Sequence, residues 1–194
     1  MSEIGALAVF CGSKTGNNPA HREAATRLGE AMAARGIRLV YGGGSIGLMG
    51  VMAVAARQAG GHVTGVIPDF LVKYEVADHE VTELVVVDSM HDRKRRMFEL
   101  ADGFVVLPGG LGTLDEVIEI VTWKQLRLHA KPVVLVDIEG CWRPLQALVD
   151  SIVSQGFAHP AVGELFSVVV DVNDVFRALA AAPEPKPEVL TSHL

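Results

Sequence analysis

The sequence predicts an α/β protein in which a mainly parallel sheet of about seven strands is doubly wound, with helices on both faces. The first observation is that short apolar, β-branched runs alternate with helix-length segments along the chain. The second is that runs such as FVVL at 104–107 and VVLV at 133–136 are apolar at every position. Such strands are expected in a parallel sheet that helices cover from both sides.

The predicted elements follow one another as strand and helix throughout. Strands are expected at residues 6–10, 38–41, 62–67, 83–87, 103–107, 132–136 and 167–170. Helices are expected at residues 19–35, 48–58, 90–100, 113–127, 142–155 and 172–181. Ligands of doubly wound sheets bind outside the carboxyl ends of the strands, so the residues that follow each strand are the first candidates for a site.

The chain has the size of one domain. Its 194 residues, of which 49% are hydrophobic, can bury a substantial core. We therefore expect a single α/β domain over residues 1–181. The segment 182–194 contains Pro183, Pro185 and Pro187 and few core-forming residues, so we expect it to be a disordered tail.

The charge balance argues against two classes of partner. The formal net charge of -6 and the pI near 5.6 provide no broad basic field for nucleic acid or for an anionic membrane surface. No apolar run reaches the ~20 residues of a membrane-spanning helix, and the first residues lack the pattern of a signal peptide. Cys11 and Cys141 form no CxxC pair, which fits a reducing, cytoplasmic location.

Two glycine-rich loops each follow an apolar run and open a helix. The first reads GGGSIG at 42–47, with GxGxxG spacing, and the second reads PGGLGTLDE at 108–116. Glycines permit close backbone approach, and the N–H groups at a helix start can receive an anion. Either loop alone could be structural, but the pair at one sheet edge indicates a phosphate site. Thr113 could cap the second helix or contact the phosphate.

A third loop, CGSKTG at 11–16, follows the first strand and adds hydroxyl and ammonium groups at the same edge. It either wraps a nucleotide or forms an ordinary strand-to-helix turn. Cys11 is interpreted as a small buried residue and not as a nucleophile, because no histidine follows at a helpful position nearby.

Charged residues stand at the start of two predicted helices. Glu116 is expected in the first helical turn, where the helix dipole favours an ionised carboxylate whether its role is structural or functional. The segment MHDRKRRM at 90–97 places four basic residues near the positive end of another helix dipole. This unfavourable placement suggests a phosphorylated ligand, although helical spacing allows only some of these side chains to face it.

Several catalytic patterns are missing from the sequence. There is no HExxH motif, no grouping of His, Asp and Glu at ligand spacing and no GxSxG elbow. We therefore predict neither a catalytic metal nor serine-hydrolase chemistry, and we predict no cofactor. Nothing identifies a lysine that would form a Schiff base with pyridoxal phosphate.

Three motifs together resemble those of the LOG family, the cytokinin riboside 5′-monophosphate phosphoribohydrolases, some of whose relatives carry the label lysine decarboxylase. The motifs are GGGSIGLMG at 42–50, MHDRKRRM at 90–97 and PGGxGTxxE at 108–116. The similarity runs from about residue 7 to 157 and includes TWKQL at 122–126 and HAKPV at 129–133. The resemblance implies a Rossmann-like, nucleotide-binding fold, a homodimer, and hydrolysis of N6-modified AMP, and of AMP itself, to free base and ribose 5-phosphate.

The resemblance also implies the site residues. Arg93 and Glu116 match the catalytic pair, and Thr122 matches a ligand contact although it lies about 120° around the helix from Glu116. The candidate substrate-binding residues are Gly12, Ser13, Gly43, Gly44, Glu75, Met90, Lys94, Gly109, Gly110, Leu111, Gly112, Thr113, Leu114, Asp115 and Thr122.

The proposed chemistry needs opposite charges, because cleavage of an N-glycosidic bond develops a ribosyl cation and an anionic purine. We expect Glu116 to stabilise the cation or orient the attacking water, and Arg93 to hold the substrate and the leaving group. The family commonly has Gly where Arg127 stands and Glu where Asp115 stands. These departures, and that of the loop 70–74, bear on substrate preference.

Two other functions use similar features. A non-catalytic carrier of a nucleotide or of molybdenum cofactor would use the same glycine loops, but it would not need Arg93 with Glu116. A dinucleotide oxidoreductase would explain the loop at 42–47 and Asp69 about 20 residues on. The second loop with its adjoining acid has no place in that fingerprint.

Overall fold

The computed structural model describes residues 4–72 and 77–183. Within them a seven-stranded sheet has the order β4-β3-β2-β1-β5-β6-β7, and every neighbouring pair of strands is parallel. The strands are β1 (Ala6–Phe10), β2 (Arg38–Tyr41), β3 (Val63–Pro68), β4 (Glu83–Val87), β5 (Gly103–Val106), β6 (Val133–Val136) and β7 (Ser167–Val169). The predicted doubly wound, Rossmann-like α/β fold is confirmed.

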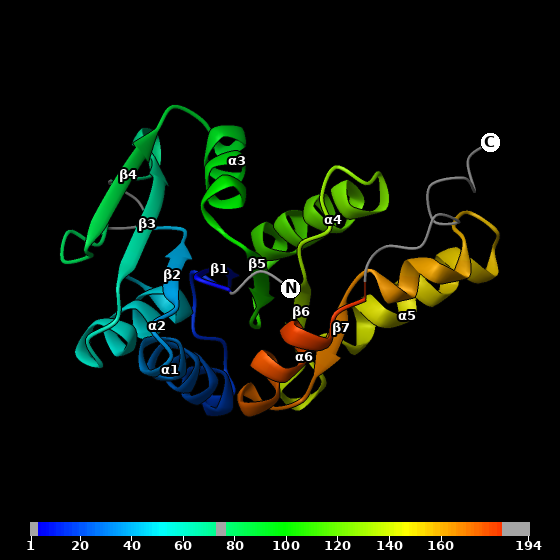
Figure 1. Ribbon diagram of the computed structural model, residues 1–194, viewed down its shortest axis with the longest axis horizontal. Helices are drawn as coiled ribbons and strands as arrows, with labels where there is room; N and C mark the ends of the chain where they lie inside the picture. Colours follow the sequence, from blue (N-terminus) through cyan, green and yellow to red (C-terminus); the bar gives the residue numbers. More distant parts are fainter. Residues whose placement is uncertain (1–3, 73–76, 184–194) are drawn as a thin grey trace.

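Helices cover both faces of the sheet (Figure 1). One face carries α1 (Pro19–Ala34), α2 (Gly47–Gln58) and α6 (Val175–Ala181). The other carries α3 (Met90–Leu100), α4 (Leu111–Gln125) and α5 (Arg143–Ser154). Short 3-10 turns lie at Asp69–Leu71, Ile138–Gly140, Pro160–Glu164 and Val172–Asp174.

The central strand shows why the sequence lacks polar alternation. Leu7 and Val9 of β1 pack into the core beneath α1, α2 and α6, whereas Ala8 and Phe10 pack into the core beneath α3, α4 and α5. All four side chains are at most 2% exposed. A strand with helices on both faces buries every side chain, so apolar residues are required at consecutive positions.

The boundaries of α4 differ from the prediction. The helix begins at Leu111, because Gly110 adopts the extended N-cap conformation and the next two residues are already helical. The prediction that Glu116 lies in the first turn is therefore wrong, since no acidic residue stands there. The helix ends at Gln125, two residues earlier than predicted, because Arg127 takes a left-handed φ of 59°.

The chain reverses its winding direction between β1 and β5. These strands are neighbours, yet β1 leads into α1 on one face and β5 leads into α4 on the other. The loops after the two strands diverge and leave a crevice at the carboxyl edge of the sheet, where open α/β sheets bind their ligands.

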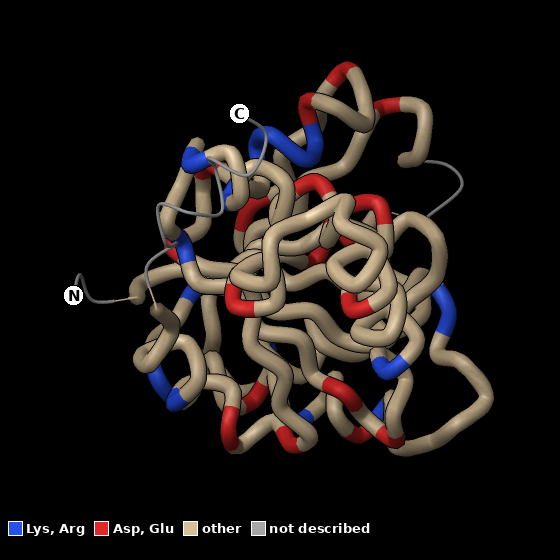
Figure 2. Tube along the Cα trace, turned by 90° about the vertical axis from the view of Figure 1, so that its right-hand side faces the viewer, with Lys and Arg blue, Asp and Glu red and all other residues tan. Residues whose placement is uncertain are grey.

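The surface and the chain ends bear on the remaining expectations. Figure 2 shows acidic and basic positions interspersed along the trace. None of the described helices combines the length and the apolar character needed to cross a membrane. Glu75 and most of the predicted tail, residues 184–194, lie outside the described residues.

Candidate active site

A cavity of about 230 Å³ lies at the crevice between β1 and β5, on the face that carries α3 and α4. It combines the loop after β1, the starts of α3 and α4, and a few apolar side chains. Most of the predicted site residues that line it belong to these segments. Its lining is Val9, Phe10, Cys11, Gly12, Ser13, Gly42, Met49, Leu71, Met90, Arg93, Met97, Gly110, Leu111, Gly112, Thr113 and Glu116.

The start of α4 forms one wall of this cavity. Its N-cap residue, Gly110, provides no side-chain hydrogen bond to the helix, and Thr113 is 3% exposed within the first turn. The expectation that Thr113 could be the cap is wrong, because it lies three residues inside the helix. The N–H groups at the start of a helix are unsatisfied when no side chain caps them, and together with the dipole they make an anion site.

Arg93 is the one member of the basic run on α3 that lines the cavity, and it is only 4% exposed. Its Nη2 donates to the carbonyl oxygen of Gly42 at 2.6 Å, and its Nε donates to that of Val66 at 3.1 Å. A Cβ at Gly42 would overlap the guanidinium. Backbone carbonyl groups of β3 and of the loop after β2 thus fix the orientation of the Arg93 side chain. The side chain therefore loses little conformational freedom when a ligand binds.

Glu116 lies in the second turn of α4 and lines the same cavity as Arg93. Both charges act on the thiol of Cys11. Burial and the Glu116 carboxylate raise the pKa of this thiol, while Arg93 partly opposes the shift. Cys11 is therefore a neutral, buried thiol at neutral pH, as the sequence indicated.

The other basic residues of α3 have acidic partners. Lys94 Nζ lies 3.0 Å from Asp115 Oδ2 and 2.9 Å from Glu119 Oε2, both on α4. Partial burial would lower the pKa of Lys94, but the hydrogen bonds to the two carboxylates outweigh it and raise that pKa. The structure therefore brings together the predicted residues Lys94 and Asp115 as a link between two helices, and neither lines the cavity.

The unfavourable charge at the start of α3 is compensated locally. Ser89 is the N-cap, with its Oγ accepting from the Asp92 amide at 3.1 Å, and Arg95 pairs with Asp92 at 3.0 Å. Arg96 pairs with Glu99 at 3.3 Å. As the helical spacing predicted, only part of the basic run faces one site.

The first glycine loop is held by hydrogen bonds and packing contacts over most of its length. Of its residues at 42–47, only Gly42 lines the cavity beside Arg93. The Asp78 amide donates to the carbonyl of Gly43 at 2.9 Å, and Gly44 forms a bridge with Ala77. Gly47 has a φ of 64° and packs against the backbone of Ser13. The loop also follows β2, which is not one of the two strands at the winding reversal. It therefore lacks the position of a dinucleotide-binding loop in a doubly wound sheet.

The remaining predicted residues lie around the cavity. Gly109 lines a neighbouring cavity, and Leu114 packs into the core under α4. Thr122 is exposed on α4 and lines neither cavity. The described residues contain no group of three His, Cys, Asp or Glu side chains arranged to hold a metal.

Seven residues of the cavity were not among the predicted site residues: Val9, Phe10, Cys11, Gly42, Met49, Leu71 and Met97. Gly42 is the acceptor for Arg93, and Met49 and Leu71 are apolar walls. Leu71 belongs to the turn after β3, so the rule that sites follow strand ends could have indicated it. Met49 stands in the first turn of α2, where it resembles any other buried helix residue.

Known proteins resemble this chain over most of its length. Residues 49–179 match the family model described as "Possible lysine decarboxylase". A protein of Oryza sativa subsp. japonica named "Probable cytokinin riboside 5'-monophosphate phosphoribohydrolase" is 47% identical over 92% of this chain and 79% of its own length. A cytokinin riboside 5'-monophosphate phosphoribohydrolase of Arabidopsis thaliana is 41% identical over 97% of this chain and 86% of its own length.

Solved structures show the same fold. A molybdenum cofactor carrier protein from Chlamydomonas reinhardtii aligns with a TM-score of 0.67 at 24% identity, over 92% of this chain and 99% of that one. A molybdenum cofactor binding protein from Rippkaea orientalis aligns with a TM-score of 0.70 at 20% identity, over 93% and 98%. At such identities the likeness extends to the fold alone.

Proposed function

The chain belongs to the LOG family of cytokinin riboside 5′-monophosphate phosphoribohydrolases, and we propose that it is a nucleotide N-glycosidase. Its substrates are N6-modified AMP and, in addition, AMP, and its products are the free base and ribose 5-phosphate. The observation that carries this proposal is that the buried Arg93 and the half-buried Glu116 line one cavity, which is closed at one side by the uncapped start of α4.

The start of α4 is where the 5′-phosphate binds in this proposal. The backbone N–H groups of Leu111, Gly112 and Thr113 and the positive end of the helix dipole suit an anion. Gly12, Ser13 and Gly110 line the same cavity and allow a ligand to approach the backbone closely. Glu116 lies one turn further along the helix, so a bound phosphate and the reacting bond would be held by one rigid element.

The opposite charges of the cavity match those of the reaction. Cleavage of the N-glycosidic bond creates an oxocarbenium-like ribose. The Glu116 carboxylate stabilises this cation or orients the water that attacks it. Arg93 holds the substrate and compensates the negative charge that develops on the purine. Because Arg93 is already fixed by two carbonyl groups, little reorganisation is needed at the transition state.

The phosphate supplies binding energy that positions the bond to be cleaved. Such remote binding energy appears in the rate of the reaction and not only in the affinity. The nucleoside without its phosphate is therefore a much poorer substrate. Removal of the phosphate should lower kcat as well as raise KM.

A substitution of the acid tests this proposal. Glu116→Gln should bind nucleotide but release base at least 100-fold more slowly, because the amide cannot balance the ribosyl cation. Asp115→Asn is the matched control, since it removes the neighbouring carboxylate, which pairs with Lys94 outside the cavity. Near-normal turnover by Glu116→Gln would reject the assigned role, and tight nucleotide binding without turnover by the unmodified protein would favour the carrier function.

We further infer a homodimer in the cytoplasm. Large apolar side chains are exposed along and after α4, where Ile118 is 44%, Leu126 45% and Leu128 67% exposed. Thr122 lies between Ile118 and Leu126 on the same face of the helix. An exposed apolar patch of this kind supports an interface between chains. The free thiols Cys11 and Cys141 support a reducing compartment.

A further inference from the structure

A second and larger cavity, of about 440 Å³, lies on the opposite side of the crevice between β1 and β5. It shares Gly12, Ser13 and Gly110 with the candidate active site but contains neither Arg93 nor Glu116. Its volume falls within the usual range of small-molecule sites. The function proposed above leaves this cavity without a role.

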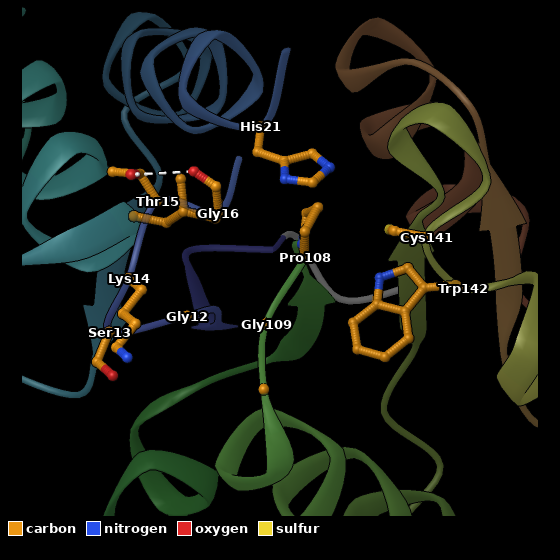
Figure 3. Close-up of a pocket in the computed structure, with 12 residues that line it drawn as sticks. Gly12, Ser13, Lys14, Thr15, Gly16, His21, Pro108, Gly109, Cys141 and Trp142 are labelled. Carbon is orange, nitrogen blue, oxygen red and sulfur yellow. Dashed lines mark hydrogen bonds between the residues drawn. The ribbon is translucent and has the colours of Figure 1, made fainter. Parts of the chain in front are cut away.

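The loop after β1 supplies polar groups to the side of the cavity that lies opposite Trp142 (Figure 3). Ser13, Lys14 and Thr15 come from the loop after β1 and add two hydroxyls and an ammonium to its lining. Gly109 and Gly110, at the start of α4, line it as well. None of the described residues that line it is acidic. This end suits a phosphate or another small anion.

The other end is lined mainly by ring side chains. His21 of α1, Pro108 and Trp142 surround it, and Cys141 lies beside the indole (Figure 3). Trp142 is only 6% exposed, and its indole Nε1 has no hydrogen-bond partner among the described residues. A buried donor without an acceptor costs about 1–3 kcal/mol, and a heterocycle in this cavity would supply one.

The turn that carries Trp142 is held in a strained conformation. Glu139 has a left-handed φ of 53°, which costs a non-glycine residue about 1–2 kcal/mol. The Asp137 carboxylate, 6% exposed at the end of β6, accepts a 2.6 Å hydrogen bond from the Trp142 amide. Strain that the surrounding structure maintains is more common at ligand sites than elsewhere.

We propose that this cavity is a second nucleotide site, which binds a nucleoside 5′-monophosphate with its phosphate at Ser13, Lys14 and Thr15 and its base between His21, Pro108 and Trp142. The separation of an anion-binding end from an end lined by rings matches the phosphate and the base of a mononucleotide. Because Gly12, Ser13 and Gly110 line both cavities, an occupant of the second one contacts the segments that hold the substrate in the first.

The stoichiometry of AMP binding tests this site. In Glu116→Gln protein, in which turnover should be slow, equilibrium dialysis should find two AMP molecules per chain. Adding Lys14→Ala or His21→Ala should weaken the second binding event by about tenfold or more and leave the first unchanged. Arg22→Ala is the control, because it removes an exposed cation next to His21 that lines neither cavity.

The fluorescence of Trp142 shows where the second AMP binds. The chain has two tryptophans, so Trp123→Phe leaves Trp142 as the single emitter. Titration with AMP should change the emission of Trp142, with a midpoint that matches the affinity of the second binding event. His21→Ala should shift this midpoint by the same factor by which it weakens that binding event in dialysis. In an otherwise unmodified enzyme, Lys14→Ala and His21→Ala should retain turnover of N6-isopentenyl-AMP at low concentration within about twofold.

Three results would overturn the proposal. They are one AMP per chain in Glu116→Gln protein, two AMP per chain that neither Lys14→Ala nor His21→Ala affects, and loss of turnover together with loss of binding in those two variants. The last result would assign the cavity to the active site. If no nucleotide is hydrolysed at all, the enzymatic function fails, while two AMP per chain would still support this second site.

Discussion

Arg93 and Lys124 are two buried cationic residues that lie in different environments. Arg93 is 4% exposed and donates to two backbone carbonyl groups beside the candidate active site. Lys124 is 1% exposed on α4, and burial alone lowers its pKa to about 8. The sequence marked the first through its motif but gave no sign that the second is buried.

Gly42 should act as a positioning residue for Arg93. In Gly42→Ala the new methyl group would overlap the guanidinium, so Arg93 must leave the carbonyl that it now contacts. A misplaced catalytic group commonly costs about 100-fold, and we expect a loss of that order in kcat with a smaller change in KM. Steady-state kinetics with N6-isopentenyl-AMP measures this split.

The matched control is Gly163→Ala, where a Cβ meets open space and φ is not left-handed. It should leave both kinetic constants unchanged. Urea unfolding of Gly42→Ala should show a folded protein. Unchanged kcat in that variant would mean that Gly42 does not position the cation.

Lys124 should make the stability of the protein depend on pH in the alkaline range. Its pKa is about 8 in the folded protein and about 10.4 in an unfolded chain, so the folded state binds its proton less tightly. The cost is complete below pH 8 and disappears as the pH rises towards 10.4. Lys124→Met should therefore raise the free energy of unfolding at pH 7 by roughly 2–3 kcal/mol.

Urea unfolding at pH 7 and at pH 9.5 checks this prediction. The gain from Lys124→Met should shrink at the higher pH, whereas Lys14→Met, at an exposed lysine, should show no such trend. A gain that is equal at both pH values would show that burial of the charge is not its cause.

At the scale of elements, the two ends of α4 show which conformation the residues of the family motifs adopt. The glycines before Leu111 leave the first turn uncapped and open to an anion. At the other end Arg127 adopts a left-handed conformation, at the position where the LOG family commonly has Gly. The departure seen in the sequence is therefore a matter of backbone strain at a helix end, and it lies away from both cavities.

Arg127→Gly should stabilise the protein relative to Arg127→Ala. Both variants remove the same side-chain contacts, but alanine keeps the Cβ that makes a φ of 59° unfavourable. The difference in the free energy of unfolding should be about 1 kcal/mol in favour of glycine. Equal stabilities in urea would show that the position carries no strain.

The motif at 129–133 has a structural role that its sequence did not reveal. His129 receives a 3.1 Å hydrogen bond at Nδ1 from the Lys131 amide and contacts the carbonyl of Ile120 through Nε2 at 2.9 Å. Lys131 Nζ donates to the carbonyl of Phe98 at 2.6 Å. These residues join α4, α3 and the start of β6, so a matching motif does not by itself make a residue part of a site.

At the scale of the whole molecule, the sequence predicted what depends on local pattern. Consecutive apolar residues identified the strands of the parallel sheet, and the rule that ligands bind beyond strand ends led to the loops at 11–16 and 108–113. The pairing of Lys94 with Asp115 and the contact of Arg93 with Gly42 could not be predicted. Both depend on how α3 packs against segments far away in the chain.

The homodimer is a prediction about the whole molecule. Sedimentation equilibrium should give a mass of twice the 20.7 kDa chain. Leu128→Asp should shift the protein towards the monomer, because a carboxylate in an apolar interface must lose its hydration. Asp150→Ala, a polar position on α5, is the control for loss of a surface side chain. A monomeric mass for the unmodified protein at micromolar concentration would contradict the dimer.

In our proposal, Arg93, Glu116 and the start of α4 together cleave the N-glycosidic bond of a nucleoside 5′-monophosphate. The most direct measurement is chromatography of the products formed by the purified protein from N6-isopentenyl-AMP and from AMP. We expect free base and ribose 5-phosphate in equal amounts, with far less base from the corresponding nucleosides. Absence of free base from both nucleotides would contradict the proposal.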